Sequence, residues 1–137
     1  MKVKKLTFLL LLLVASSLHA QELKPPLAPL PQSISKQQWQ DHIQTNLPPE
    51  LCKQDQYFIQ CFETTTQECV DFTRVLVQAC LSNVLVGLPE SLDKEKGAHW
   101  GQLIARCSYD LYDKFMQKKK KSTQACQNVK PPVASKP

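Results

Sequence analysis

The sequence lacks the patterns on which nucleophilic, phosphate-binding and metal-dependent enzymes depend. It contains no GxSxG, HExxH or P-loop motif and no paired-carboxylate pattern. It has no CxxC pair, and no cysteine–histidine cluster has the spacing of zinc ligands. We therefore expect no catalytic, cofactor-binding or metal-binding site.

The few residues left for acid–base chemistry have simpler explanations. His42 lies on a short amphipathic stretch and His99 beside a tryptophan, where an isolated histidine is typical of a packed or surface residue. Asp110 and Asp113 are close in sequence, but Arg106 precedes Asp110 by four residues, so solvated ion pairs account for them. The sequence predicts that the protein is not an enzyme.

Long apolar runs are also missing, except at the start of the chain. Three lysines precede an apolar run at residues 6–14, and small residues prevail in residues 15–20. This order favours a secretory signal peptide over a membrane anchor, with cleavage after Ala20, or alternatively after Ser17. We expect an exported protein, periplasmic or secreted, with no transmembrane helix in its mature part.

Cysteine is the residue that the mature chain has in abundance. Removing residues 1–20 from the 137-residue chain leaves 117 residues, enough for one small domain, and all six cysteines lie in that part. An even number of cysteines in a short exported chain predicts disulfides, which stabilise a domain whose core is small. We expect three disulfides and no free thiol.

Apolar periodicity predicts an all-α domain over residues 35–126, a small disulfide-stapled bundle of three or four helices around a central helical hairpin. Ser33 or Ser35 offers the first N-cap, and Thr65 with Glu68 fits a capping box for the central helix. Ser91 offers the cap of the last helix. The expected helices span residues 35–47, 49–62, 65–87 and 91–121, with breaks at Pro48 and Gly87.

The ends of the mature chain read as non-helical. Residues 21–34 contain four prolines and predict an extended, polyproline-like arm, and residues 127–137 predict a flexible polar tail.

Charge is divided unevenly along the mature chain. Residues 22–113 have a balance of −5, whereas residues 114–137 hold seven lysines and no acid.

The cysteine pairing is predicted from the central hairpin. If the helix at 49–62 folds back against the helix at 65–87, residues with nearly equal index sums face one another. The remaining two cysteines then join the tail to the last helix. The predicted bonds are Cys52–Cys80, Cys61–Cys69 and Cys107–Cys126.

An alternative pairing stays open, because six cysteines allow fifteen connectivities. It joins Cys80 to Cys107 and leaves Cys69 to meet Cys52, Cys61 or Cys126. The spacing C-x8-C followed by C-x10-C over residues 52–80 resembles, in architecture, the twin-cysteine helical hairpins held by an inner and an outer disulfide. That resemblance implies a stapled scaffold and no activity.

The lysine run near the end of the last helix is the most visible surface feature. Cations at a helix C-terminus favour the helix dipole, and they also suit an anionic partner such as lipid headgroups or polysaccharide. Nucleic acid is not expected, because no aromatic residues alternate with the lysines. The run comprises Lys118, Lys119, Lys120 and Lys121. We expect a module that binds another protein or, alternatively, an effector that contacts anionic surfaces through this run.

Overall fold

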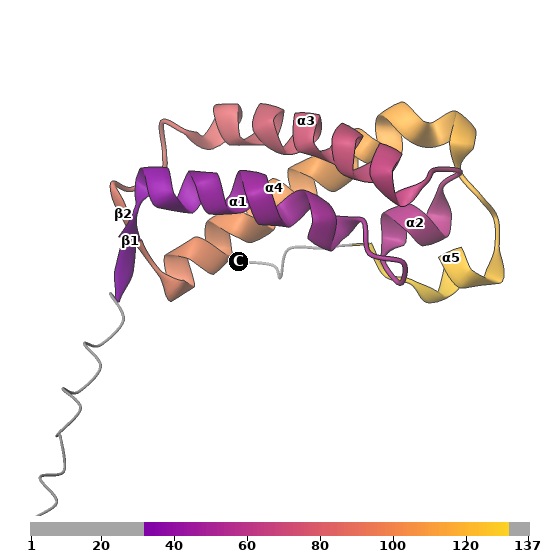
Figure 1. Cartoon of the computed structure of the whole chain (residues 1–137), viewed down its shortest axis with the longest axis horizontal. Helices are drawn as coiled ribbons and strands as arrows, with labels where there is room; N and C mark the ends of the chain where they lie inside the picture. Colours follow the sequence, from indigo (N-terminus) through magenta and orange to yellow (C-terminus); the bar gives the residue numbers. More distant parts are fainter. Residues whose placement is uncertain (1–31, 132–137) are drawn as a thin grey trace, which may run out of the picture.

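Three long helices dominate the part of the chain that the structure describes. The computed structural model describes residues 32–131. The long helices lie side by side (Figure 1). They are α1 (Lys36–Leu51), α3 (Thr66–Val84) and α4 (Lys94–Met116). The shorter elements are β1 (Ser33–Ser35), α2 (Tyr57–Cys61), β2 (Ser91–Asp93), the 3-10 helix η1 (Gln117–Lys119) and α5 (Gln124–Asn128). The predicted all-α, disulfide-bonded class is confirmed.

A two-stranded antiparallel sheet closes one end of the bundle (Figure 1). In its register Ile34 faces Leu92, whose side chain is buried among the residues of the core. No local sequence pattern predicts this sheet, because its strands are three residues long and far apart in the chain. The boundary expected after residue 34 falls inside β1, and the one expected after residue 126 falls inside α5.

The first helix continues through Pro48 and Pro49, so the predicted break before Pro48 is wrong. A proline in a helix removes one backbone hydrogen bond to the carbonyl four residues earlier. Those carbonyls belong to Gln44 and Thr45, which are exposed, so water can satisfy them. The cost is therefore small enough for the helix to reach Leu51.

An aromatic cluster fills the opposite end of the bundle, around α2. The ring of Phe58 stacks on that of Tyr112, with centroids 3.9 Å apart and planes at 9°. Phe62 meets Tyr112 edge-on at 5.2 Å, and Tyr57 meets Tyr109 edge-on at 5.1 Å. Such pairs add to the stabilisation from apolar burial. This cluster joins α2 to the last two turns of α4.

Two of the predicted helix caps are confirmed. Ser35 and Thr65 each accept a hydrogen bond from the third residue of the following helix, and each forms a complete capping box. Two other predictions are wrong. Asp93 and not Ser91 caps α4, since Ser91 belongs to β2. Gly87 follows α3, but no described residue has positive φ, so it is not a left-handed cap.

All three predicted disulfides are wrong. In place of Cys52–Cys80, Cys61–Cys69 and Cys107–Cys126, the structure forms Cys52–Cys69, Cys61–Cys126 and Cys80–Cys107, with Cα–Cα distances of 5.8, 4.6 and 5.9 Å. The alternative pairing that joins Cys80 to Cys107 is therefore the correct one, with Cys69 meeting Cys52.

The error came from the assumption of a continuous helix over residues 49–62. The chain instead turns after α1, where the amide of Gln56 donates to the carbonyl of Lys53 (2.9 Å). Helix α1 therefore packs antiparallel to α3, and its C-terminal Cys52 meets Cys69 in the first turn of α3. The twin-cysteine hairpin implied by the spacing is absent from residues 52–80.

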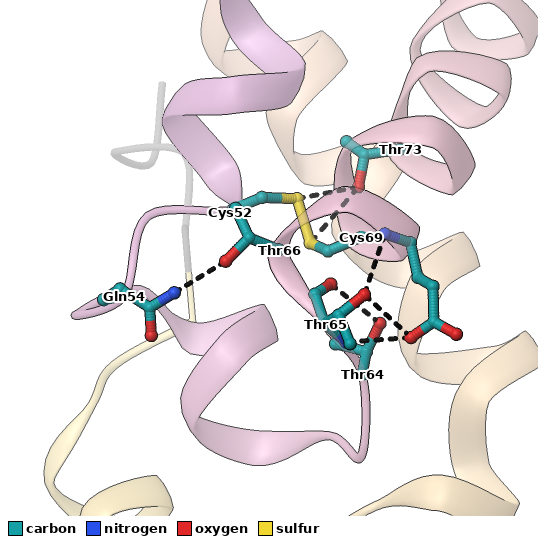
Figure 2. Close-up of a disulfide and its surroundings, with 8 residues drawn as sticks. Cys52, Gln54, Thr64, Thr65, Thr66, Cys69 and Thr73 are labelled. Atoms are coloured by element: carbon teal, nitrogen blue, oxygen red, sulfur yellow. Dashed lines mark hydrogen bonds between the residues drawn. A yellow bond between two sulfur atoms is a disulfide. The ribbon is translucent and has the colours of Figure 1, made fainter.

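Figure 2 shows the surroundings of the Cys52–Cys69 bond. The buried hydroxyl of Thr73 lies 3.4 Å from the sulfur of Cys52 and 3.9 Å from that of Cys69. Because a disulfide has no S–H group, the hydroxyl is the donor. The side chain of Gln54 donates to the hydroxyl of Thr66 (2.6 Å), so the turn after α1 is also joined to the start of α3.

Candidate interaction surfaces

The structure divides the lysine run into two residues with tethered side chains, of which Lys120 is still 39% exposed, and two exposed residues on η1. The Nζ of Lys120 lies 2.5 Å from Oδ1 of Asp113, and 5.7 and 5.9 Å from the ring centroids of Phe62 and Tyr57. The Nζ of Lys121 donates to the carbonyl of Ile59 (2.9 Å). Both side chains are therefore bound to the protein itself.

The backbone on either side of these lysines is bound as well. The amide of Lys121 donates to the carbonyl of Cys61, and the amide of Glu63 donates to the carbonyl of Lys119, each at 2.8 Å. The segment therefore lies across the end of α2 as a short bridge. Lys118 and Lys119 remain exposed on η1. Contact with an anionic partner stays a prediction, now with two lysines in place of four.

The electrostatics of this region follow from the same contacts. The hydrogen bond to Asp113 raises the pKa of Lys120 above its ordinary value. Burial, and after it a hydrogen bond to Tyr57, raises the pKa of Tyr109 to about 12. The sequence spacing does not predict this ion pair, because residues seven apart on a continuous helix lie about 10 Å apart along its axis, whereas α4 ends at Met116 and the chain turns before Lys120.

An exposed apolar face lies where the start of α3 meets the end of α4. Phe115 is 63% exposed and Val75 is 61% exposed. The ring of Phe72, three residues before Val75, meets the ring of Phe115 edge-on at 6.3 Å. Apolar residues at helical spacing along α4, such as Ile104 and Leu111, continue to Phe115, yet the ring of Phe115 is largely exposed. We call Phe72, Val75 and Phe115 the apolar face.

The histidines and aspartates that the sequence singled out make their contacts with other residues and not with one another. The Nδ1 of His42 accepts from the side-chain amide of Asn46 (3.1 Å), and His99 meets Trp100 edge-on at 5.8 Å. Asp113 is paired with Lys120. Within residues 32–131, no cluster of three or more His, Cys, Asp or Glu side chains is arranged to hold a metal. None of the helices in that range has the length and apolarity of a membrane span.

A comparison with protein families decides which family this fold represents. The family model described as "T2SS substrate NttA" matches residues 33–130, which include every helix and strand described above. The chain belongs to this family. No curated protein and no solved structure matches the chain significantly.

Membership of a family of T2SS substrates, together with three disulfides, shows that the protein is exported. This confirms the coarser part of the expectation from the sequence. The predicted signal peptide and most of the proline-rich arm lie outside the described residues. The choice between periplasm and extracellular space therefore stays a prediction, as does the cleavage site.

Proposed function

We propose that the protein is a secreted, non-catalytic module that binds another protein through the apolar face. The observation that carries this proposal is the exposure of Phe115 and Val75 beside the ring of Phe72. Contiguous apolar surface on a small exported protein marks an interaction site, and aromatic side chains are enriched at the energetic centres of interfaces.

The charges around the apolar face favour a protein partner over an anionic membrane. Lys114 and Lys118 are neighbours of Phe115 on the α4 side, whereas Glu68 and Asp71 lie one turn before Phe72 and Val75 on α3. A hydrogen bond from the backbone of Thr65 keeps the pKa of Glu68 below its ordinary value, so this carboxylate is charged at neutral pH. An anionic lipid surface would be repelled on the α3 side, but a protein can present both signs of charge.

That the protein is not an enzyme is part of the same proposal. The described residues contain no free cysteine, and the two histidines have no nucleophile as a partner. A nucleophile and a base within hydrogen-bonding reach would be required for covalent catalysis. We accordingly assign the protein to recognition and not to turnover.

Site-specific photo-crosslinking tests the proposal in the culture that exports the protein. A photoreactive side chain replaces Val75 in one variant and Gln44 in a control variant; Gln44 is exposed on α1. We expect one protein adduct of defined mass at position 75, lost when Phe115→Asp is added, and no such adduct at position 44. Equal labelling at both positions would contradict the proposal.

A second candidate function, contact with anionic surfaces, is favoured by the exposure of Lys118 and Lys119 on η1. Its test is vesicle binding at low salt by the Lys118→Gln/Lys119→Gln variant. The matched control changes Lys114 alone to Gln, which leaves the two η1 lysines in place. Lys120 and Lys121 are kept, because their side chains are bonded to Asp113 and to the carbonyl of Ile59. Equal binding by wild type and the double variant would remove this candidate.

A further inference from the structure

A cavity of about 430 Å³ opens at the sheet end of the bundle, remote from the apolar face. Its walls come from four elements, β1, α1, β2 and the first turn of α4. Apolar wall residues include Ile34, Trp39 and Leu92, and Gln32 and His42 contribute polar groups. Its size and composition are those of a ligand pocket, apolar with a few polar groups.

Trp39 carries an unused hydrogen-bond donor on the wall of this cavity. The residue is 4% exposed, yet its indole N–H has no acceptor among the described residues. Unlike the hydroxyl oxygen of Ser108, which also lacks a partner, this nitrogen is not fully enclosed by protein. Because this N–H reaches the cavity, an acceptor bound there can pair with it in place of water.

Gly97 fixes where the indole sits. A Cβ at this position would lie 3.2 Å from Nε1 of Trp39, so the absence of a side chain lets the indole approach α4. The donor is therefore held by packing in a defined place.

His42 supplies a second donor at the same cavity. The side-chain amide of Asn46 donates to Nδ1 of His42 (3.1 Å) and also to the carbonyl of His42 (2.9 Å), which fixes the amide orientation. Because Nδ1 accepts, the neutral ring carries its proton on Nε2. The carboxylate of Asp93 at the rim is already engaged, since it accepts from the amide of Lys96 (2.8 Å).

Apolar walls with N–H donors suit a ligand that is rich in carbonyl acceptors and poor in N–H groups. Proline-rich chains have this chemistry, because proline lacks an N–H, and they bind aromatic grooves in an extended form at low entropic cost. We propose that this cavity binds a proline-rich extended segment, and that the occupant is residues 21–31 of the same chain.

The position of the cavity in the chain supports this occupant. Gln32, the first described residue, itself lines the cavity, and the sequence before it, QELKPPLAPLP, contains four prolines. A segment joined directly to the wall of its binding site has an effective concentration in the millimolar range. A free peptide of equal intrinsic affinity would compete poorly with it.

Nuclear magnetic resonance of the exported, ¹⁵N-labelled protein provides the direct test. In the wild-type protein we expect nuclear Overhauser effects between the indole N–H proton of Trp39 and proline ring protons of residues 25–31. The test needs no variant, so it does not depend on the folding of one. Absence of these effects would overturn the proposal.

A variant in the full-length exported chain gives a second readout. Changing Pro25, Pro26, Pro29 and Pro31 to Ala should make hydrogen exchange at the Trp39 indole about tenfold faster, because a protecting hydrogen bond is lost. The indole of Trp100 is the internal control and should not change. Gln21→Ala/Glu22→Ala is the matched control variant in the same segment, and it should leave Trp39 unchanged.

Two further outcomes decide the source of the segment. A synthetic peptide of residues 21–31, acetylated and amidated, should restore slow exchange when added to the four-proline variant. Equal exchange at Trp39 in wild type and variant would overturn the proposal. Protection that weakens when the protein is diluted would also overturn it, because the proline-rich segment would then come from a second copy of the chain.

Discussion

The Nζ of Lys120 lies 2.5 Å from Oδ1 of Asp113, and this ion pair joins the segment after α4 to the helix that it has just left. The rings of Phe62 and Tyr57 flank the ammonium group within 6 Å of their centroids. In the sequence Lys120 is one member of a lysine run. In the structure its side chain connects the segment after η1 to α4 and to the aromatic residues of α2 and the turn that follows it.

Lys120→Met should lower the free energy of unfolding by about 1 kcal/mol, because it removes a partly exposed ion pair and its cation–π contacts. The measurement is urea unfolding with the disulfides intact. Lys118→Met is the matched control on the exposed part of the run and should stay within about 0.5 kcal/mol of wild type. Equal effects of the two changes would show that Lys120 is as solvated as its neighbour.

Stability should fall in alkaline solution. The pKa of Tyr109 is raised to about 12 by burial and a hydrogen bond to Tyr57, and burial also raises the pKa of Tyr112. Both phenols favour the neutral form in the folded protein. Their contribution is therefore complete below the unfolded pKa, near 10, and is lost as the pH rises through the folded pKa.

The free energy of unfolding should accordingly decline between about pH 10 and pH 12. Denaturant titration at each pH measures this decline. Tyr109→Phe should make the decline shallower. Ultraviolet titration of wild type and Tyr109→Phe provides the check on the cause, because their difference isolates Tyr109: its ionisation at an ordinary pKa of about 10 in the folded protein would contradict the prediction.

Non-reducing peptide mapping should recover cross-linked peptides that contain Cys52 with Cys69, Cys61 with Cys126, and Cys80 with Cys107. Recovery of a Cys52–Cys80 peptide in the folded protein would disprove the arrangement of α1 against α3. The map therefore tests the order of the helices as well as the bonds.

Changing both Cys61 and Cys126 to Ala should cost about 2–4 kcal/mol, because this bond closes the longest of the three loops, with a sequence separation of 65. The amide of Lys121 should exchange faster, since its acceptor is the carbonyl of Cys61. Amides in the middle of α3 serve as the control and should report only the global change. Unchanged protection of Lys121 would show that the bridge holds without the bond.

Two glycines of α4 form a matched pair for a test of packing. A Cβ at Gly101 would meet Ile43 at an ordinary 3.6 Å, whereas one at Gly97 would meet Trp39 at 3.2 Å. Gly101→Ala should therefore raise the free energy of unfolding by up to about 1 kcal/mol through helix propensity. Gly97→Ala should be about 1 kcal/mol less stable than Gly101→Ala, because the indole must move. Equal stabilities in thermal unfolding would contradict a fixed Trp39.

Local signals in the sequence were read correctly where neighbouring residues make the structure. Ser35 and Thr65 form the capping boxes that their spacing predicts, since both partners lie within one helical turn. The same reading failed at Pro48, where the cost of two lost hydrogen bonds is offset by packing along α1. It also missed the sheet, because three-residue strands that pair across more than fifty residues leave no local pattern.

The candidate surfaces were only half visible in the sequence. The lysine run could be found by inspection, but its division into tethered and exposed residues depends on where α2 lies. The apolar face could not be found, because Phe115 continues the apolar spacing of α4, and only the placement of α4 against α3 leaves its ring largely exposed beside Phe72.

The sequence by itself determined a small exported helical domain with every cysteine in a disulfide, since composition, helix caps and apolar periodicity are local properties. Only the tertiary structure decided which cysteines meet, which lysines are exposed and where the cavity at Trp39 opens. The physical reason is that bonds and surfaces depend on the relative placement of helices, and one turn after α1 changes that placement for all of them.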